Sequence, residues 1–110
     1  MAETENLIQV DQDAAARVKQ LGMERELEQM LEYASRMRGF RGARVTLEYD
    51  PVCPHTEPSV VIWAHHDVPP EGPAADRTNW DMIAWRVATF PPQVWVQLSM
   101  IAVYGPPDER

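Results

Sequence analysis

The sequence predicts an α+β domain in which a small antiparallel sheet, of about three to four strands, packs against two N-terminal helices. Two patterns lead to this class. Apolar residues recur at helical spacing through Met23–Met37, whereas Arg44–Asp50 alternates apolar and polar side chains as a half-buried strand does. The chain has 110 residues, enough for one modest hydrophobic core, so we expect a single domain over residues 1–110.

The first element expected is a short edge strand over the apolar run Asn6–Val10. Asp11 then occupies the position of a helix N-cap, ahead of a helix over Gln12–Leu21. Gly22 follows that helix and favours its termination, because glycine readily adopts the left-handed conformation of a C-terminal cap.

The second helix has the most regular pattern in the chain. A single apolar stripe is formed by Met23, Leu27, Met30, Leu31, Ala34 and Met37. Glutamates cluster near the start of this segment and arginines near its end, which suits the helix dipole, and Gly39 closes it. We expect the methionines to pack in the core, since the stripe is narrow and regular.

Two strands are expected in the middle of the chain. Val45, Leu47 and Tyr49 share one face of the first. The second, Ser59–His66, is apolar on both faces and is therefore expected at the centre of the sheet. The loops around it are rich in proline: Pro51, Pro54 and Pro58 precede it, and Val68–Ala75, expected to be an irregular loop, follows it.

The C-terminal third is ambiguous. Within Trp80–Phe90 we favour a strand over Trp85–Thr89, because of its β-branched and aromatic content. The last segment, Gln93–Tyr104, fits either the alternation of a strand or the spacing of a helix. Proline before it and Gly105-Pro106 after it favour a C-terminal helix.

Composition excludes several functional classes. A net charge of −7 argues against broad nucleic-acid binding, which needs a basic surface. The N-terminal region is too charged for a signal peptide, and no apolar run is long enough to span a membrane. The single cysteine permits no intramolecular disulfide, so we expect a cytoplasmic protein.

All the histidines and the only cysteine fall within one short window, Cys53-Pro-His55 and His65-His66-Asp67. If Ser59–His66 is extended, its length of about 23 Å separates the two halves of this window, too far for them to share one ion. Adjacent strand residues also point to opposite faces. We therefore expect no metal site and no cofactor.

The chain has one basic stretch, the arginine stretch of Arg36, Arg38, Arg41 and Arg44. The same hairpin is expected to bring part of the cysteine–histidine window near it. Arg44 should lie roughly opposite His65, with Arg41 close to Asp67. The resulting corner of Arg41, Arg44, His65, His66 and Asp67 is a candidate anion site, because the guanidinium fork matches phosphate and carboxylate. The simpler interpretation, which we favour, is a surface ion pair between Asp67 and one of the arginines.

The tryptophans, Trp63, Trp80, Trp85 and Trp95, are many for a small domain and are candidates for an interface or for the core. The function we favour is a non-catalytic interaction or regulatory domain that binds itself or a basic protein. The alternative is an anion-binding protein or an enzyme at the predicted corner, although the chain has no phosphate loop, nucleophile elbow or HExxH motif. RNA binding ranks last, since Phe40 is the only aromatic residue within the arginine stretch.

Overall fold

The computed structural model describes residues 7–53, 55–69 and 72–105. Within this part of the chain the elements follow in the order β1 (Ile8–Val10), α2 (Gln12–Leu21), α3 (Glu24–Ser35), β2 (Phe40–Glu48), β3 (Ser59–His66), α4 (Pro73–Thr89), α5 (Pro92–Trp95) and β4 (Leu98–Tyr104). The α+β class and the two N-terminal helices are confirmed. No helix in the described ranges is both long and apolar enough to cross a membrane.

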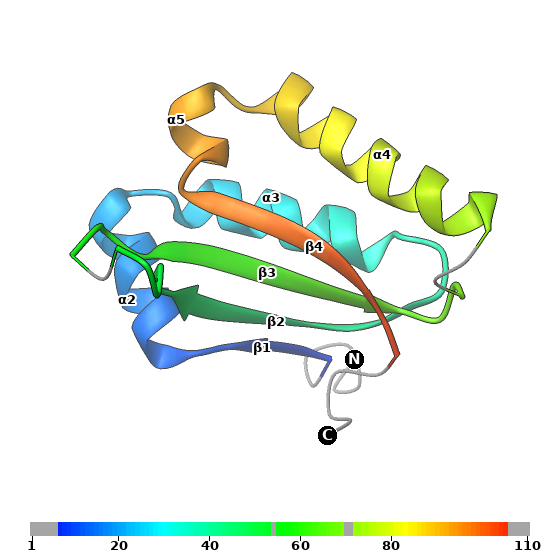
Figure 1. Cartoon of the computed structure of the whole chain (residues 1–110), viewed down its shortest axis with the longest axis horizontal. Coiled ribbons are helices and arrows are strands. Elements are labelled where there is room, and N and C mark those ends of the chain that lie inside the picture. Colours follow the sequence, from blue (N-terminus) through cyan, green and yellow to red (C-terminus); the bar gives the residue numbers. More distant parts are fainter. Residues whose placement is uncertain (1–6, 54, 70–71, 106–110) are drawn as a thin grey trace.

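The strands form one sheet in the order β1-β2-β3-β4 (Figure 1). Only the central pair, β2 and β3, is antiparallel, while β1 runs parallel to β2 and β4 runs parallel to β3. The sheet is therefore mixed rather than antiparallel as the sequence led us to expect. The cause is the connections: helices join β1 to β2 and β3 to β4, and such crossovers return the chain in its original direction.

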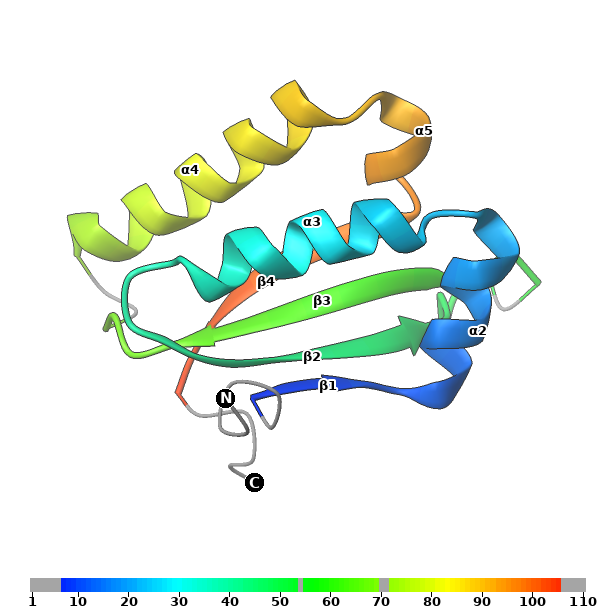
Figure 2. The same cartoon turned by 180° about the vertical axis from the view of Figure 1, so that it is seen from behind.

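The helices α3 and α4 pack over one face of the sheet, and no described helix covers the other face (Figures 1 and 2). The core lies between these two layers. Its largest fully buried side chains come from both of them: Met30 and Met82 from the helices, and Val45, Ile62 and Leu98 from the strands. The structure is thus a two-layer domain with one sheet face uncovered by helix in the described ranges.

The N-terminal half closely follows its sequence signals. The helix α2 begins after Asp11 and ends at Gly22, which adopts the left-handed conformation with φ of 69°. The Asp11 carboxylate does not cap the helix, however, and instead accepts hydrogen bonds from Arg44. In α3, Met30 and Ala34 of the predicted stripe are buried.

The C-terminal third differs from the prediction. The proposed strand Trp85–Thr89 is the C-terminal part of α4, which begins at Pro73 within the expected loop Val68–Ala75. The proposed helix Gln93–Tyr104 was also wrong for most of its length, because only Pro92–Trp95 is helical and Leu98–Tyr104 is the strand β4. Both helices have proline in their first turn, where its missing N–H costs nothing.

The strand β2 starts at Phe40, whereas the prediction began at Arg44. Arg41 and Arg44 therefore both lie within the sheet. β3 spans Ser59–His66 as predicted. Five residues of the segments discussed above lie outside the described residues: Asn6, Pro54, Pro70, Glu71 and Pro106.

Candidate functional site

The cysteine–histidine window is split by the hairpin of β2 and β3. The register pairs Phe40 with His66 at one end of the hairpin and Glu48 with Ser59 at the other. The loop that carries Cys53 and His55 follows Glu48, so it lies at the far end from His66. In the described part of the chain, no group of three or more histidine, cysteine or acidic side chains is placed to hold a metal ion.

Two members of the predicted corner do meet. Arg41 and Asp67 form an ion pair with 3.7 Å between nitrogen and oxygen, and about half of each side chain is exposed. The Asp67 N–H donates to the carbonyl of Gly39, and a Cβ at Gly39 would run into the Asp67 carboxylate. Glycine at this position, with φ of 74°, therefore permits the close approach. The pair itself contributes little, because water screens both charges.

The two histidines of the corner project to opposite faces of β3. His65 lies on the face that no described helix covers, where its Nδ1 donates to the carbonyl of Gly105 at 3.1 Å. His66 lies beneath the helices and is only 4% exposed. Its Nδ1 accepts a hydrogen bond of 3.1 Å from the Val68 N–H. Because the strand continues through both residues, they cannot act together on one ligand.

Arg44 lies on the same sheet face as His65 but is not directly opposite it. The register places it opposite Trp63, whereas His65 faces Gly42. Its guanidinium donates to the Asp11 carboxylate at 3.3 and 3.4 Å. This register is regular from Glu48 to Gly42, and the irregularity between Phe40 and Gly42 changes only the pairing of Phe40. The structure thus brings Arg41 and Asp67 together, whereas Arg44 pairs with Asp11, His65 bonds to Gly105, and His66 lies on the opposite face.

Because His66 is buried, we expect the free energy of unfolding to depend on pH. Burial lowers its pKa below the ordinary value near 6.5; the Asp67 carboxylate opposes this shift and His65 adds to it. The unfolded chain therefore binds more protons below about pH 6.5, and the free energy of unfolding falls as the pH drops through this window. Urea unfolding at neutral and mildly acidic pH should show a smaller loss for His66→Gln than for the wild type. The variant His55→Gln, in an exposed loop, is the control and should keep the wild-type dependence of stability on pH. If the free energy of unfolding changed equally with pH in all three proteins, this role of His66 would be contradicted.

The tryptophans divide between the interior and the surface. Trp85 stacks on Tyr33 of α3 with ring centroids 4.3 Å apart and meets Phe90 edge-on at 5.5 Å. Trp95 is partly buried against the same core. Trp63 lies on the sheet face without helices and donates from Nε1 to the Thr46 hydroxyl at 2.9 Å. Trp80 is 69% exposed.

Trp80 belongs to a second apolar face of α4, which sequence reasoning missed. Ile83 and Val87 are 40% and 47% exposed, and Ala84 is also exposed. Positions 80, 83, 84 and 87 follow the i, i+3, i+4, i+7 spacing of one helix face. We call Trp80, Ile83, Ala84 and Val87 the α4 stripe. The signal was in the sequence, but the inner face of α4 is apolar too, and the helix therefore lacks a clear amphipathic pattern.

The strand β4 provides an exposed edge beside α4. It is the last strand of the described sheet and pairs only with β3. The ladder begins with the Val60 N–H donating to Gln97 and ends with the Gly105 N–H donating to His66. In a parallel ladder alternate residues bond to the neighbour, so the backbone groups of Met100, Ala102 and Tyr104 point outward. We call these outward groups the β4 edge.

Arg86 ties α4 to the start of this edge. Its guanidinium donates to the Leu98 carbonyl at 3.0 Å, and burial lowers its pKa from the usual arginine value. Ile83 lies one helical turn before Arg86 and so on the same side of α4. Trp85, which contacts α3, lies on the other side. The α4 stripe therefore adjoins the β4 edge.

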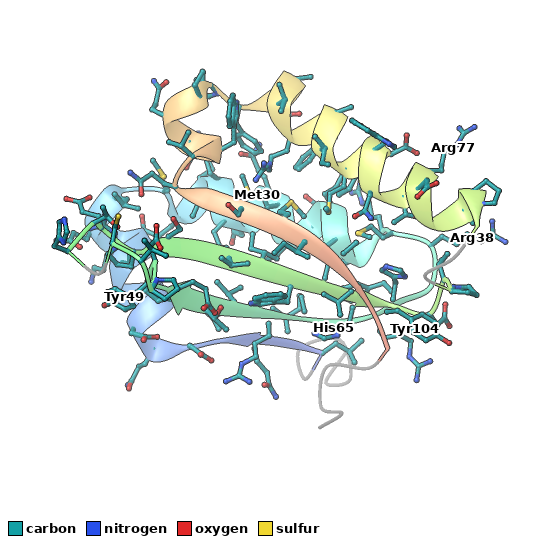
Figure 3. The ribbon with its side chains drawn as sticks, in the orientation of Figure 1. Met30, Arg38, Tyr49, His65, Arg77 and Tyr104 are labelled. Atoms are coloured by element: carbon teal, nitrogen blue, oxygen red, sulfur yellow. The ribbon has the colours of Figure 1, made fainter. Side chains whose placement is uncertain are left out.

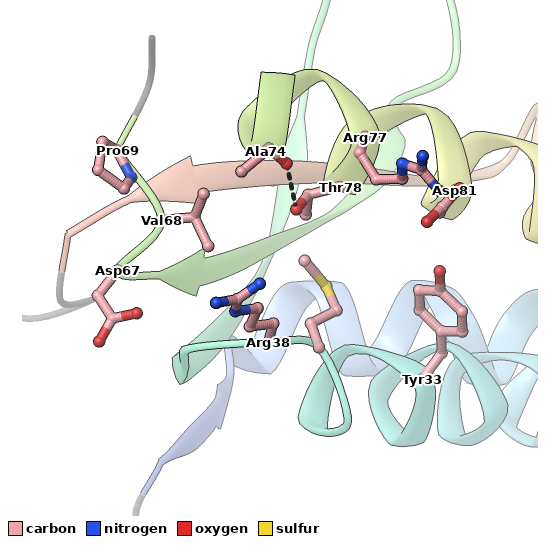
Figure 4. Close-up of a pocket in the computed structure, with 10 residues that line it drawn as sticks. Tyr33, Arg38, Asp67, Val68, Pro69, Ala74, Arg77, Thr78 and Asp81 are labelled. Atoms are coloured by element: carbon pink, nitrogen blue, oxygen red, sulfur yellow. Dashed lines mark hydrogen bonds between the residues drawn. The ribbon is translucent and has the colours of Figure 1, made fainter. Parts of the chain in front are cut away.

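A cavity of about 490 Å³ opens at the other end of α4, between its first turns and the end of α3 (Figure 4). It is lined by Tyr33, Met37, Arg38, Asp67, Val68, Pro69, Ala74, Arg77, Thr78 and Asp81. Arg38 and Arg77 lie at the same end of the molecule, away from Tyr49 (Figure 3). Of the predicted corner residues, only Asp67 reaches this cavity.

Comparison with protein-family models, with curated proteins and with solved structures gives no significant match for this chain.

Proposed function

We propose that this chain is a non-catalytic interaction domain whose partner is a second copy of itself. The two copies associate through the α4 stripe and the β4 edge. The observation that carries the proposal is the continuity of these two surfaces. One is an apolar helix face centred on exposed Trp80 and Ile83, and the other is the edge of β4 that pairs with no described strand. Large exposed apolar patches and free strand edges both favour association.

A two-fold axis perpendicular to the sheet satisfies both surfaces at once. It places β4 antiparallel to its copy, where the outward backbone groups can bond to each other. The same axis sets α4 antiparallel to the partner's α4, so that the stripe meets itself. Such an interface is isologous and closes at two subunits.

The available area is sufficient for a specific dimer. The helix of 17 residues is about 25 Å long. The helix and sheet layers together are about 20 Å thick, so each copy presents roughly 500 Å². The total of about 1,000 Å² reaches the lower limit of a specific interface. We therefore expect a reversible dimer.

Charge also favours a second copy over a basic partner at this surface. Neither β4 nor the α4 stripe contains a charged residue, although the chain carries a net charge of −7. The exposed acids Glu24, Glu28 and Glu32 lie on α3 instead. A basic protein would therefore bind elsewhere, and we do not assign it to this interface.

The alternative function, a small-anion binder or an enzyme at the predicted corner, has weaker support. Arg41, Arg44, His65, His66 and Asp67 do not converge on one cavity, since Arg44 is engaged by Asp11 and the two histidines occupy opposite faces. A cytoplasmic location remains part of the proposal and has its support in the sequence alone.

Light scattering on a size-exclusion column tests self-association directly. We expect a concentration-dependent species of twice the 12.6 kDa chain mass. Its affinity should increase with salt, because salt screens the repulsion between two acidic copies and leaves apolar contacts intact. A strict monomer up to about 100 µM at high salt would contradict the proposal, since the expected affinity lies in the micromolar range.

A further inference from the structure

We propose that the cavity between α3 and α4 binds a small amphipathic carboxylate, with its apolar body against Met37 and Val68 and its carboxylate at Arg38. This inference goes beyond the proposed self-association and does not depend on it. The cavity has the size of a typical small-molecule site, for which roughly 300–1,000 Å³ is usual.

The space exists because the inner face of α4 changes in size along the helix. At the C-terminal end, Trp85 fills the gap to α3 by stacking on Tyr33. About two and three turns earlier the helix presents Thr78 and Ala74, whose short side chains leave the cavity open (Figure 4). The Thr78 hydroxyl already donates to the Ala74 carbonyl at 2.9 Å. Over this stretch the short side chains of α4 do not fill the space to α3, and the cavity results.

The walls combine an apolar lining with the polar side chains of Arg38, Asp67, Arg77, Thr78 and Asp81. Met37, Val68, Pro69 and Ala74 supply the apolar surface, and Val68 is held in place by its N–H bond to His66. The Tyr33 ring extends from α3 toward Asp81 on α4 (Figure 4). Burial, followed by the charge of Asp81, raises the pKa of Tyr33, so its hydroxyl stays protonated and able to donate. An apolar wall beside polar groups suits a ligand that has both an apolar body and a polar end.

Within the described residues, the Arg38 guanidinium at the cavity has no ion-pair partner. Among the described residues the ion pairs of the chain do not include Arg38 or Arg77. Arg77 and Asp81 lie one turn apart on α4, where opposite charges offset each other. Asp67 is engaged by Arg41. Arg38 therefore remains as the uncompensated charge, and its guanidinium suits a carboxylate.

A monocarboxylate fits these walls better than other charged ligands. A single free guanidinium matches one negative charge, whereas a dianionic phosphate would meet Asp67 and Asp81 with too little positive charge to offset them. A cation with a hydrophobic body would place its positive charge near the Arg38 guanidinium and would be repelled by it. The apolar lining requires that the carboxylate carry a hydrophobic body.

Titration calorimetry with decanoate tests this proposal, with acetate and decyltrimethylammonium as the other probes. We expect saturable binding of decanoate, and at least about tenfold weaker binding of the other two, because each lacks either the apolar body or the negative charge. Arg38→Gln should weaken decanoate binding about ten- to hundredfold. Arg36→Gln is the matched control; Arg36 lies near the same helix end but pairs with Glu32, outside the cavity, and its loss should leave binding unchanged.

A second variant keeps the test independent of Arg38. Ala74→Phe fills the cavity from α4 and leaves Arg38 and Arg77 unreplaced. We expect it to abolish decanoate binding. Trp80→Arg, which disrupts the α4 stripe, should retain binding and so separates this proposal from self-association. Absence of saturable decanoate binding, equal binding of the cation, or undiminished binding by Arg38→Gln or Ala74→Phe would overturn the inference.

Discussion

Replacement of Trp80 by arginine is expected to weaken self-association by about thirtyfold or more. Trp80 is the largest exposed apolar side chain of the α4 stripe, and a central tryptophan commonly contributes about 2 kcal/mol or more to an interface. The arginine would also place a charge in a surface that must lose its water on binding. Sedimentation equilibrium of the wild type and the variant measures the change.

The matched control is Val52→Arg. Val52 is 83% exposed in the loop between β2 and β3, so the substitution adds the same charge at a site outside the α4 stripe and the β4 edge. It should leave the dimerisation constant within about threefold, because it touches neither surface. Circular dichroism should show both variants folded, since neither side chain is buried. Equal weakening by the two substitutions would indicate a general charge effect and count against the stripe.

The largest effect on stability is expected at Ile62. This side chain is fully buried in the central strand β3, between the sheet and the helices. Its replacement by alanine removes buried methylene and methyl groups and leaves a cavity, which costs about 3 kcal/mol. That is a large part of the roughly 5–15 kcal/mol that stabilises a domain. Urea unfolding at low protein concentration gives the difference without a contribution from association.

Ile101→Ala is the control with the same chemistry. Ile101 lies on the adjacent strand β4, opposite Trp63, on the sheet face that no described helix covers, and is 41% exposed. We expect a loss below about 1 kcal/mol, because less apolar surface is returned to water. Similar losses at both positions would mean that the uncovered face carries a core of its own.

The N-terminal half of the fold could be predicted because its local signals and its final environment agree. The apolar stripe of α3 is the face that packs on the sheet, and Gly22 ends α2 in the conformation glycine favours. β3 is apolar on both faces and pairs on both sides, as a central strand should. In these elements the residue pattern and the tertiary packing point to the same structure.

The helix α4 could not be predicted in the same way. Met82 and Trp85 face the interior while Ile83 and Val87 face outward, so the segment has apolar residues all around. Its β-branched and aromatic residues then favoured a strand. Pro73 at the first helical turn was the informative signal, but it lay inside a proline-rich segment interpreted as a loop. This exposed apolar face is also the basis of the proposed self-association.

The strand β4 and the corner depended on long-range pairing that local patterns do not contain. Leu98–Tyr104 satisfies helical and strand spacing alike, and its pairing with β3 decides between them. In the observed register Arg44 lies opposite Trp63, whereas the predicted partner was His65. The hairpin predicted an ion pair of Asp67 with Arg41 or Arg44, and the structure has it with Arg41. The cavity at Arg38 and Arg77 depends on the relative placement of α3 and α4, which local patterns do not contain.

Amide hydrogen exchange along β4, followed by NMR at low and high protein concentration, tests the central claim most directly. The N–H groups of Ile101 and Val103 bond to β3 within one chain and should be protected at both concentrations. The outward N–H groups of Met100, Ala102 and Tyr104 gain partners only in the dimer. We predict that their protection appears as the concentration rises. Rapid exchange of these three amides under conditions where the protein is a dimer would contradict association through the β4 edge.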